Sequence, residues 1–237
     1  MSVEILKDRE QNERAREALR MLGLSMTSPA IARALRRLGL MRGINIGDRL
    51  KSWDVLRTLQ LMEEHVPMDS PVLDIGAYCS EVPCILHKRG YTDVSAIDLN
   101  PAIASMPFSD AIRYSVANFM ETPFEDASFA AVTATSVIEH GLDSGRLLGE
   151  LGRILRPGGL FIASVDYWPE KLDTSGKQAF GMDWLIFSRD DLMGFMKEAE
   201  GYGFSPLGPM DFEAGEPTVR WQGESYTFAW FAIRKEA

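Results

Sequence analysis

Residues 72–80 read VLDIGAYCS, and this stretch decides the fold. Its apolar start is typical of a strand buried on both faces, which shows a continuous apolar run instead of an alternating one. Gly76 permits a tight turn because it has no Cβ, and Ser80 is suited to cap a helix that begins at Glu81. The stretch therefore predicts the strand, turn and helix that open a nucleotide-type binding unit.

A second apolar strand is predicted at residues 94–98, and it ends in the carboxylate of Asp98 about 20 residues further on. Folds of this type place a ribose ligand at such a carboxylate. Because parallel strands end at the same edge of a sheet, we expect Asp74 and Asp98 to lie side by side. An unspecific explanation stays open, since Asp and Gly are common at turns after strands.

The chain has 237 residues, of which 46% are hydrophobic and 25% charged, and these values favour one globular domain with an N-terminal extension. No apolar run approaches the roughly 20 residues of a membrane span, and residues 1–20 are too charged for a secretory signal. A cytoplasmic location is therefore expected. Cys79 and Cys84 are the only cysteines, which excludes a disulfide framework and a cysteine-rich zinc site.

The net charge of −9 and the pI near 4.9 argue against nonspecific binding to phosphate backbones or anionic membranes. Such partners require clustered cations that displace counterions. Arginines do cluster at residues 14–20 and 33–37, although acids are interspersed in the first cluster. We predict no nucleic-acid partner and no membrane partner.

Hydrophobic periodicity divides the chain at about residue 70. Before this point apolar residues recur at helical spacing around residues 15–22, 31–38 and 55–66, so three helices are predicted in residues 1–69. Beyond it, strand and helix patterns alternate as in a doubly wound α/β sheet. The predicted strands are 71–76, 93–98, 111–117, 129–135, 160–165, 205–212 and 225–233, and the predicted helices are 80–89, a short one after Pro101, 143–155 and one from Ser188 to Gly201.

The Asp-Ile-Gly opening at residues 74–76 and the Arg-Pro-Gly-Gly turn at residues 156–159 carry a resemblance to a known family. With these motifs the sequence resembles the class I S-adenosylmethionine (SAM) dependent methyltransferases, of the type 11-like group, over residues 70–165. The family usually reads Asp-x-Gly-x-Gly-x-Gly, whereas Tyr78 and Ser80 stand at the second and third glycines here. Two other segments, the loop at residues 166–184 and the Lys-Ser-Trp-Asp segment at residues 51–54, carry a weaker resemblance to methyltransferases of bacterial polysaccharide and natural-product pathways.

The resemblance implies a Rossmann-like, doubly wound, seven-stranded α/β sheet that is closed by a C-terminal antiparallel hairpin. It implies a methyltransferase domain at residues 70–237, with a substrate-side insertion at 166–187, after a helical extension or lid at residues 1–69. The implied cofactor is SAM. The sequence also favours SAM over a dinucleotide, because Tyr78 and Ser80 crowd the turn where a pyrophosphate approaches backbone N–H groups.

The resemblance assigns residues to each part of SAM. Asp74 is expected to accept hydrogen bonds from its ammonium, and Asp98 to hold both ribose hydroxyls. Asn118 is expected at the adenine unless it only makes an Asx turn. Lys51 or Arg49 is expected near the methionine carboxylate, unless the two are a surface basic pair. The predicted cofactor site comprises Asp74, Gly76, Ala77, Tyr78, Asp98, Leu99, Asn118, Phe119, Ser136 and Lys51.

Methyl transfer from a sulfonium requires alignment above all, and a general base only where the acceptor is a hydroxyl. The candidate catalytic residues are His140, Asp166 and Tyr167. For His140 a second interpretation stays open, in which the Glu139-His140 pair holds the loop and the next helix. The three histidines, at 65, 87 and 140, are too scattered for an obvious metal site, and we predict that no metal is required.

Aromatic and acidic residues in 166–187 suit a sugar-like or polyhydroxylated acceptor, although such a loop can equally be packed by its own aromatic side chains. The leading hypothesis is a SAM-dependent methyltransferase that acts on a small molecule or glycan at a hydroxyl oxygen. One alternative is a catalytically silent protein of this fold that binds a partner through its N-terminal helices. Another is an NAD-dependent oxidoreductase.

Overall fold

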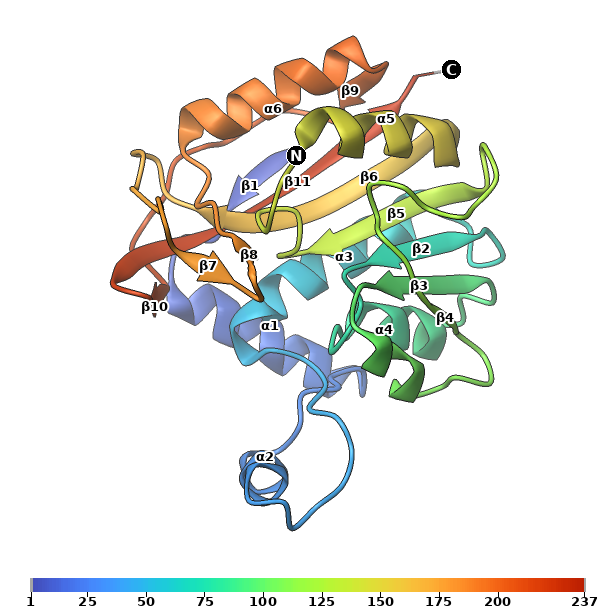
Figure 1. Ribbon diagram of the computed structural model, residues 1–237, viewed down its shortest axis with the longest axis vertical. Coiled ribbons are helices and arrows are strands. Elements are labelled where there is room, and N and C mark those ends of the chain that lie inside the picture. The colour runs from blue at the N-terminus through green and yellow to red at the C-terminus, as the bar shows by residue number, and fades with distance from the viewer. Residues whose placement is uncertain (1, 237) are drawn as a thin grey trace.

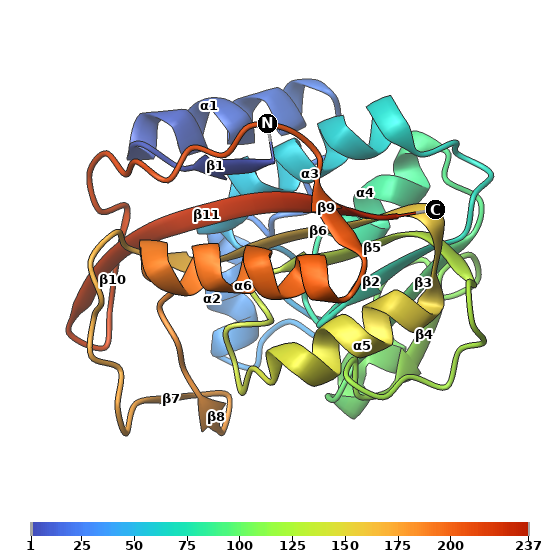
Figure 2. The ribbon, with the colours of Figure 1, turned by 90° about the horizontal axis from the view of Figure 1, so that it is seen from above.

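The structure of the protein is a computed structural model, and it describes residues 2–236. At its centre is a mixed sheet in which the described strands follow the order β1-β11-β6-β5-β2-β3-β4, with β9 and β10 paired to β11 outside this order. Helices cover both faces of the sheet (Figure 1 and Figure 2). The predicted Rossmann-like α/β fold is confirmed, and so is the antiparallel pairing at its C-terminal end. Within the described residues the sheet has nine strands where seven were predicted, because β1 and β10 both add to β11.

The parallel half of the sheet is the part that the sequence motifs predicted. β2 is buried along its whole length and pairs with β3 on one side and with β5 on the other. Because these strands all point the same way, the residues that follow them meet at one edge of the sheet. The parallel strands are β2 (Val72–Ile75), β3 (Val94–Asp98), β4 (Arg113–Val116), β5 (Phe129–Thr135) and β6 (Leu155–Tyr167).

The antiparallel half is built around β11 (Glu224–Lys235), which pairs with β6. The outer edge of β11 is shared by β1 (Val3–Ile5) and β9 (Phe204–Pro206), and β10 (Val219–Trp221) forms a hairpin with its start. The prediction that the first residues form only helices is wrong at residues 3–5. Three residues are too few to show a period, and this strand forms because the open edge of β11 offers it backbone partners.

Two turns differ from their predicted form. The helix predicted from Glu81 begins at Val82, whose N–H donates to Oγ of Ser80 at 3.2 Å. The Arg-Pro-Gly-Gly turn belongs to the start of β6, next to a register shift between β5 and β6, and Gly158 has a φ of 77°. The strand predicted at 205–212 is reduced to β9.

The helices agree closely with the predicted pattern. α4 ends at Gly90 with a φ of 102°, and α6 begins with a capping box formed by Ser188 and Asp191. None of the helices in residues 2–236 is both long enough and apolar enough to cross a bilayer. The helices are α1 (Arg9–Met21), α2 (Ala30–Arg37), the short η1 (Arg49–Lys51), α3 (Ser52–His65), α4 (Val82–Arg89), the short η2 (Pro101–Ser105), α5 (Ser144–Ile154) and α6 (Arg189–Gly201).

An apolar layer lies on each face of the sheet. Figure 2 shows α1, α3 and α4 on one side and α5 and α6 on the other. Leu59 and Ile85 belong to the first layer, and Leu151 and Phe195 belong to the second. The division of the chain at residue 69 stays a prediction, although β1 places the start of the chain inside the sheet.

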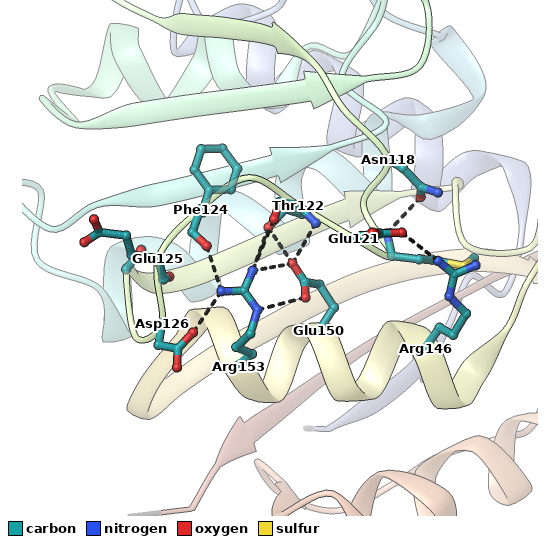
Figure 3. A network of polar contacts seen from close by, with 11 residues as sticks. Asn118, Glu121, Thr122, Phe124, Glu125, Asp126, Arg146, Glu150 and Arg153 are labelled. Carbon is teal, nitrogen blue, oxygen red and sulfur yellow. Dashed lines mark hydrogen bonds and ion pairs between the residues drawn. The ribbon is translucent and has the colours of Figure 1, made fainter.

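Arg153 of α5 holds the loop that follows β4 (Figure 3). Its guanidinium donates to the carbonyl of Phe124 at 2.7 Å and pairs with Glu150 at 2.7 Å. Glu150 in turn accepts hydrogen bonds from the N–H and the hydroxyl of Thr122, at 2.8 and 2.5 Å. The same loop carries residues 118 and 119, so this network fixes one wall of the edge at which the parallel strands end.

Replacing Arg153 by Met should lower the free energy of unfolding by about 2 kcal/mol, because it removes several charge-assisted hydrogen bonds. Chemical denaturation followed by circular dichroism measures this change. Arg146→Met is the matched control, since its ion pair with Glu121 is exposed and such pairs contribute at most about 1 kcal/mol. Equal effects of the two substitutions would contradict a stabilising role for the network.

Candidate functional site

A pocket of about 780 Å³ opens where the parallel strands end, and this volume is typical of small-molecule and cofactor sites. One half is lined by the turns after β2, β3 and β4 and by the first residue after β5. The other half is lined by the next residues after β5, by η1, β6 and the β10–β11 hairpin, and by the tip of a small hairpin of β7 (Gln178–Ala179) and β8 (Met182–Asp183). The first half includes Gly76, Tyr78, Cys79, Asp98, Leu99, Phe119 and Ser136, and the second includes Leu50, Lys51, Glu139, His140, Asp166, Phe180, Met182, Trp221, Tyr226 and Phe228.

Asp98 is held at the mouth of the first half by two backbone hydrogen bonds. Its Oδ2 accepts from the N–H of Tyr78 at 3.0 Å, and its Oδ1 accepts from the N–H of Asn100 at 2.7 Å. Each carboxylate oxygen has two lone pairs, so both oxygens can still accept a hydrogen bond from a ligand. The predicted position of Asp98 at the end of β3 is confirmed, while its role stays a prediction.

Two glycines bring the walls of the pocket close together. Gly76 has a φ of 66°, and a Cβ at this position would lie 2.3 Å from Cγ2 of Val137. Gly47 has a φ of 75°, and a Cβ there would lie 2.5 Å from Cδ of Glu81. Any larger residue at either position would push the walls apart and strain the backbone.

The structure does not bring three predicted cofactor residues to the pocket wall. Asp74 is buried, its Oδ1 accepts a hydrogen bond from Thr133 at 2.6 Å, and burial raises the pKa of this carboxyl to about 7. Ala77 is fully buried. The side chain of Asn118 accepts from the N–H of Met120 at 2.9 Å, which is the Asx turn that the sequence left open. The expectation that Asp74 presents its carboxylate to the pocket beside Asp98 is therefore corrected.

The position of Tyr167 is also corrected. Successive side chains of a strand point to opposite faces of the sheet, so Asp166 faces the pocket and Tyr167 faces away. The hydroxyl of Tyr167 donates to the carbonyl of Phe212 at 2.7 Å, and the whole side chain is buried. The aromatic residues of segment 166–187 divide in the same way, since Phe180 lines the pocket while Trp168 lines a separate cavity.

The floor of the pocket is built around the ammonium of Lys51. Its Nζ lies 3.3 Å from Oδ1 of Asp166, donates to Oγ of Ser136 and lies 3.3 Å from the ring centroid of Phe228. The indole N–H of Trp184 donates to the other oxygen of Asp166 at 2.9 Å. Lys51 thus meets two other predicted site residues, and its contact with a methionine carboxylate stays a prediction.

Two further carboxyls, Asp54 and Glu139, are buried beside this ion pair. No described residue makes a well-formed hydrogen bond to their carboxyl oxygens, although Ser164 lies close to Asp54 and Ser136 lies close to Glu139. Burial raises the pKa of Asp54 to about 7 and that of Glu139 to about 8, although the Lys51 ammonium opposes both shifts. We call Asp54, Glu139 and Asp166 the acid cluster. The cluster has three carboxyls and only one ammonium beside it. Because the pKa values of Asp54 and Glu139 are raised, these two carboxyls keep part of their protons near neutral pH.

His140 lies in the pocket wall next to this cluster. Its side chain is mostly buried, and its Nδ1 has no hydrogen-bond partner among the described residues. Burial lowers the pKa of His140, so the imidazole is neutral at pH 7. A neutral imidazole can accept a proton at its ring nitrogen that carries no hydrogen, and because Nδ1 is buried, Nε2 is the nitrogen that would have to meet a ligand in the pocket.

Sequence reasoning missed two parts of the site. Asp54 lies three residues after Lys51, so helical spacing places the two on one face, and this spacing was the available signal. The aromatic wall of Trp221, Tyr226 and Phe228 gives no local signal, because only the pairing of β11 with β6 brings it to the pocket. Within residues 2–236 no group of three or more His, Cys, Asp or Glu side chains is placed to hold a metal ion.

The raised carboxyl pKa values make the stability of the fold depend on pH. A carboxyl that binds its proton more tightly when folded stabilises the fold below its unfolded pKa, and this contribution is lost as the pH rises through the folded pKa. For Asp54 and Glu139 this window runs from about 4 to about 8. We expect the free energy of unfolding to fall across the window.

Replacing Asp54 by Asn should reduce this fall and make the protein more stable at pH 8, because an amide needs no proton to stay neutral. Thermal unfolding at a series of pH values measures the effect. Glu125→Gln, at an exposed position, is the control and should leave the pH dependence unchanged. Identical pH profiles for the Asp54 variant and the unchanged chain would contradict the prediction.

Comparison with known proteins agrees with this geometry. Residues 73–163 match the family described as "Methyltransferase domain". Demethylmenaquinone methyltransferase of Symbiobacterium thermophilum is 37% identical over 60 residues, which are 25% of this chain and 24% of that protein. The aligned stretch therefore spans about a quarter of the length of this curated relative.

Two solved structures extend the likeness over most of the chain. The geranyl diphosphate C-methyltransferase from Streptomyces coelicolor A3(2), in complex with Mg2+, geranyl diphosphate and S-adenosyl-L-homocysteine, has a TM-score of 0.57 at 16% identity and covers 88% of this chain and 99% of its own. The 1,6-didemethyltoxoflavin-N1-methyltransferase of Burkholderia thailandensis, with bound 1,6-didemethyltoxoflavin and S-adenosylhomocysteine, has a TM-score of 0.56 at 19% identity. The match covers 78% of this chain and 79% of that protein. At these identities the likeness concerns the fold. Residues 73–163 match this methyltransferase family, and the chain as a whole shares its fold with these two SAM-dependent methyltransferases.

Proposed function

We propose that the protein transfers a methyl group from SAM to a hydroxyl oxygen of a small-molecule or glycan acceptor. The observation that carries the proposal is one pocket with the carboxylate of Asp98 at one side and a neutral histidine above a buried polar floor at the other. The methyltransferase domain at residues 73–163 supports SAM as the donor. The presence of S-adenosylhomocysteine in both solved structures of similar fold supports the same donor.

The described residues fit SAM. Asp98 keeps lone pairs for the two ribose hydroxyls, and Leu99 and Phe119 lie nearby in the pocket wall as apolar cover for an adenine ring. Gly76 lines the pocket at the turn after β2, where the methionine part is proposed to lie. SAM carries no phosphate, so it does not need the free backbone N–H groups that a dinucleotide requires.

The acceptor is proposed to occupy the second half of the pocket, against Phe180, Trp221 and Tyr226. SAM supplies a methyl group that its sulfonium already activates. Asp166, which contacts Lys51 and Trp184, is proposed to accept a hydrogen bond from the acceptor. The neutral imidazole of His140 accepts the hydroxyl proton as the oxygen gains the methyl group, and it then releases this proton to solvent.

Replacing Asp98 by Asn should weaken the binding of SAM and of S-adenosylhomocysteine by about 10- to 100-fold, because hydrogen bonds to a charged group contribute roughly 1.5–3 kcal/mol. Isothermal titration calorimetry measures both affinities. Asp110→Asn, at an exposed position outside the pocket lining, is the control. An absence of heat with either ligand on the unchanged protein would favour a silent scaffold, and binding of NADH in their place would favour an oxidoreductase.

Replacing His140 by Asn should lower kcat by about 100-fold or more while SAM affinity stays unchanged, since general-base catalysis typically contributes 10²- to 10⁴-fold. A panel of nucleotide sugars and phenols with labelled SAM first identifies an acceptor, and steady-state kinetics then compares the variants. His65→Asn, at the end of α3, is the control. Undiminished turnover of the His140 variant would leave that residue a structural role only.

A further inference from the structure

Residues 18–47, which include α2, have a charge opposite in sign to that of the whole chain. No Asp or Glu occurs between Glu17 and Asp48, while this interval contains five arginines, at 20, 33, 36, 37 and 42. The chain as a whole has a net charge of −9. The net charge therefore conceals one basic segment, and the argument against anionic partners does not hold for it.

The same segment exposes large apolar side chains. We call residues 21–42 the arm. Ile31, Leu38 and Leu40 are 75%, 71% and 73% exposed, and Met21 and Leu22 at its start are 82% and 53% exposed. Soluble surfaces seldom gather so many aliphatic side chains on one short segment, and such gatherings mark interaction sites.

The arm has a defined shape and stands away from the body. Figure 1 shows α2 below the rest of the molecule, and Figure 2 shows it on the side that carries β7 and β8. Leu24 and Ile46 anchor the two ends of this segment in the body. Arg36 donates to Ser28 at 2.8 Å and to Asn45 at 2.9 Å, which ties these ends together. Arg37 and Arg42 are exposed at its outer part.

The arm is continuous with the mouth of the pocket. The chain returns from it through Gly47 and Asp48 to Leu50, all of which line the pocket. Around the mouth, Leu50, Phe180 and Trp221 are 44%, 86% and 41% exposed. Tryptophan and phenylalanine are typical side chains at the boundary between water and lipid.

From these observations we propose that the arm and the apolar rim of the pocket dock on the surface of an anionic lipid bilayer. Cations alone would suit a nucleic acid, and aliphatic side chains alone would suit another protein. Their mixture on a short protruding helix matches an interfacial segment, whose arginines meet anionic head groups while its aliphatic side chains enter the acyl boundary. Docking would turn the pocket toward the bilayer and admit an acceptor that carries an apolar tail.

Sedimentation with vesicles tests this proposal on the full chain. The protein should bind vesicles of equal parts phosphatidylcholine and phosphatidylglycerol, and it should not bind phosphatidylcholine alone. Arg37→Gln combined with Arg42→Gln should weaken binding on the order of 30-fold, because each arginine near an anionic surface contributes roughly fivefold. Leu38→Ser combined with Leu40→Ser should weaken it as well, since both side chains are exposed and their loss leaves the fold intact.

The matched controls lie elsewhere on the surface. Arg156→Gln removes an exposed arginine at the start of β6, and Met193→Ser removes a 48% exposed apolar side chain on α6. Neither should change vesicle binding. The affinity for SAM, measured by calorimetry on the same variants, should be unchanged throughout, so a failure of docking and a failure of the proposed methyl transfer give different results.

Four outcomes would overturn the proposal. The first is no binding to either kind of vesicle, and the second is binding that the arm substitutions leave unchanged. The third is an arm-dependent dimer in sedimentation equilibrium without vesicle binding, which would assign the arm to a second copy of the chain. Protection of the arm from trypsin by SAM alone, again without vesicle binding, would make it a lid and equally exclude the bilayer.

Discussion

The partly exposed ammonium of Lys51 joins the elements that make the pocket. Lys51 extends from η1 and meets Ser136 after β5, Asp166 at the end of β6 and the ring of Phe228 in β11. Removing one partner from a buried ion pair typically costs about 3–5 kcal/mol, because the remaining charge stays desolvated. η1 and the N-terminal turn of α3 must therefore pack against the ends of these strands. The pocket floor therefore also serves as one of the attachments of the N-terminal helices to the sheet, beside the apolar layer that contains Leu59.

The acid cluster lowers the stability of the protein, because it buries carboxyls around the Lys51 ammonium. Three carboxyls surround one ammonium, and no described residue makes a well-formed hydrogen bond to the oxygens of Asp54 and Glu139. Burying an unpaired carboxylate is unfavourable, so the cluster keeps protons that an exposed carboxyl would release at neutral pH. Such local destabilisation is common where a site is prepared for chemistry rather than for stability. The position of the cluster under the pocket agrees with that general pattern.

The sequence predicted best what depends on neighbours along the chain. The strands of the parallel half, the end of the helix predicted at residues 80–89 and the start of the helix predicted from Ser188 are local features, and each was found where expected. Errors arose where one residue of register or a distant partner decides the outcome. Asp166 and Tyr167 are adjacent in the sequence but face opposite sides of β6, and the aromatic wall reaches the pocket only through strand pairing. The strand at residues 3–5 forms for the same long-range reason.

The departure from the three-glycine pattern has a physical explanation in the turn after β2. Gly76 is the position where a Cβ would collide with Val137, and the second left-handed residue of the turn is Cys79, with a φ of 66°. Tyr78 does not need a left-handed conformation there, and its N–H donates to Asp98. That N–H is therefore engaged by the carboxylate that is proposed to hold the ribose, and it is not free for a phosphate. A turn built in this way suits a ligand with a ribose and no pyrophosphate, which supports SAM over a dinucleotide on the geometry of the turn itself.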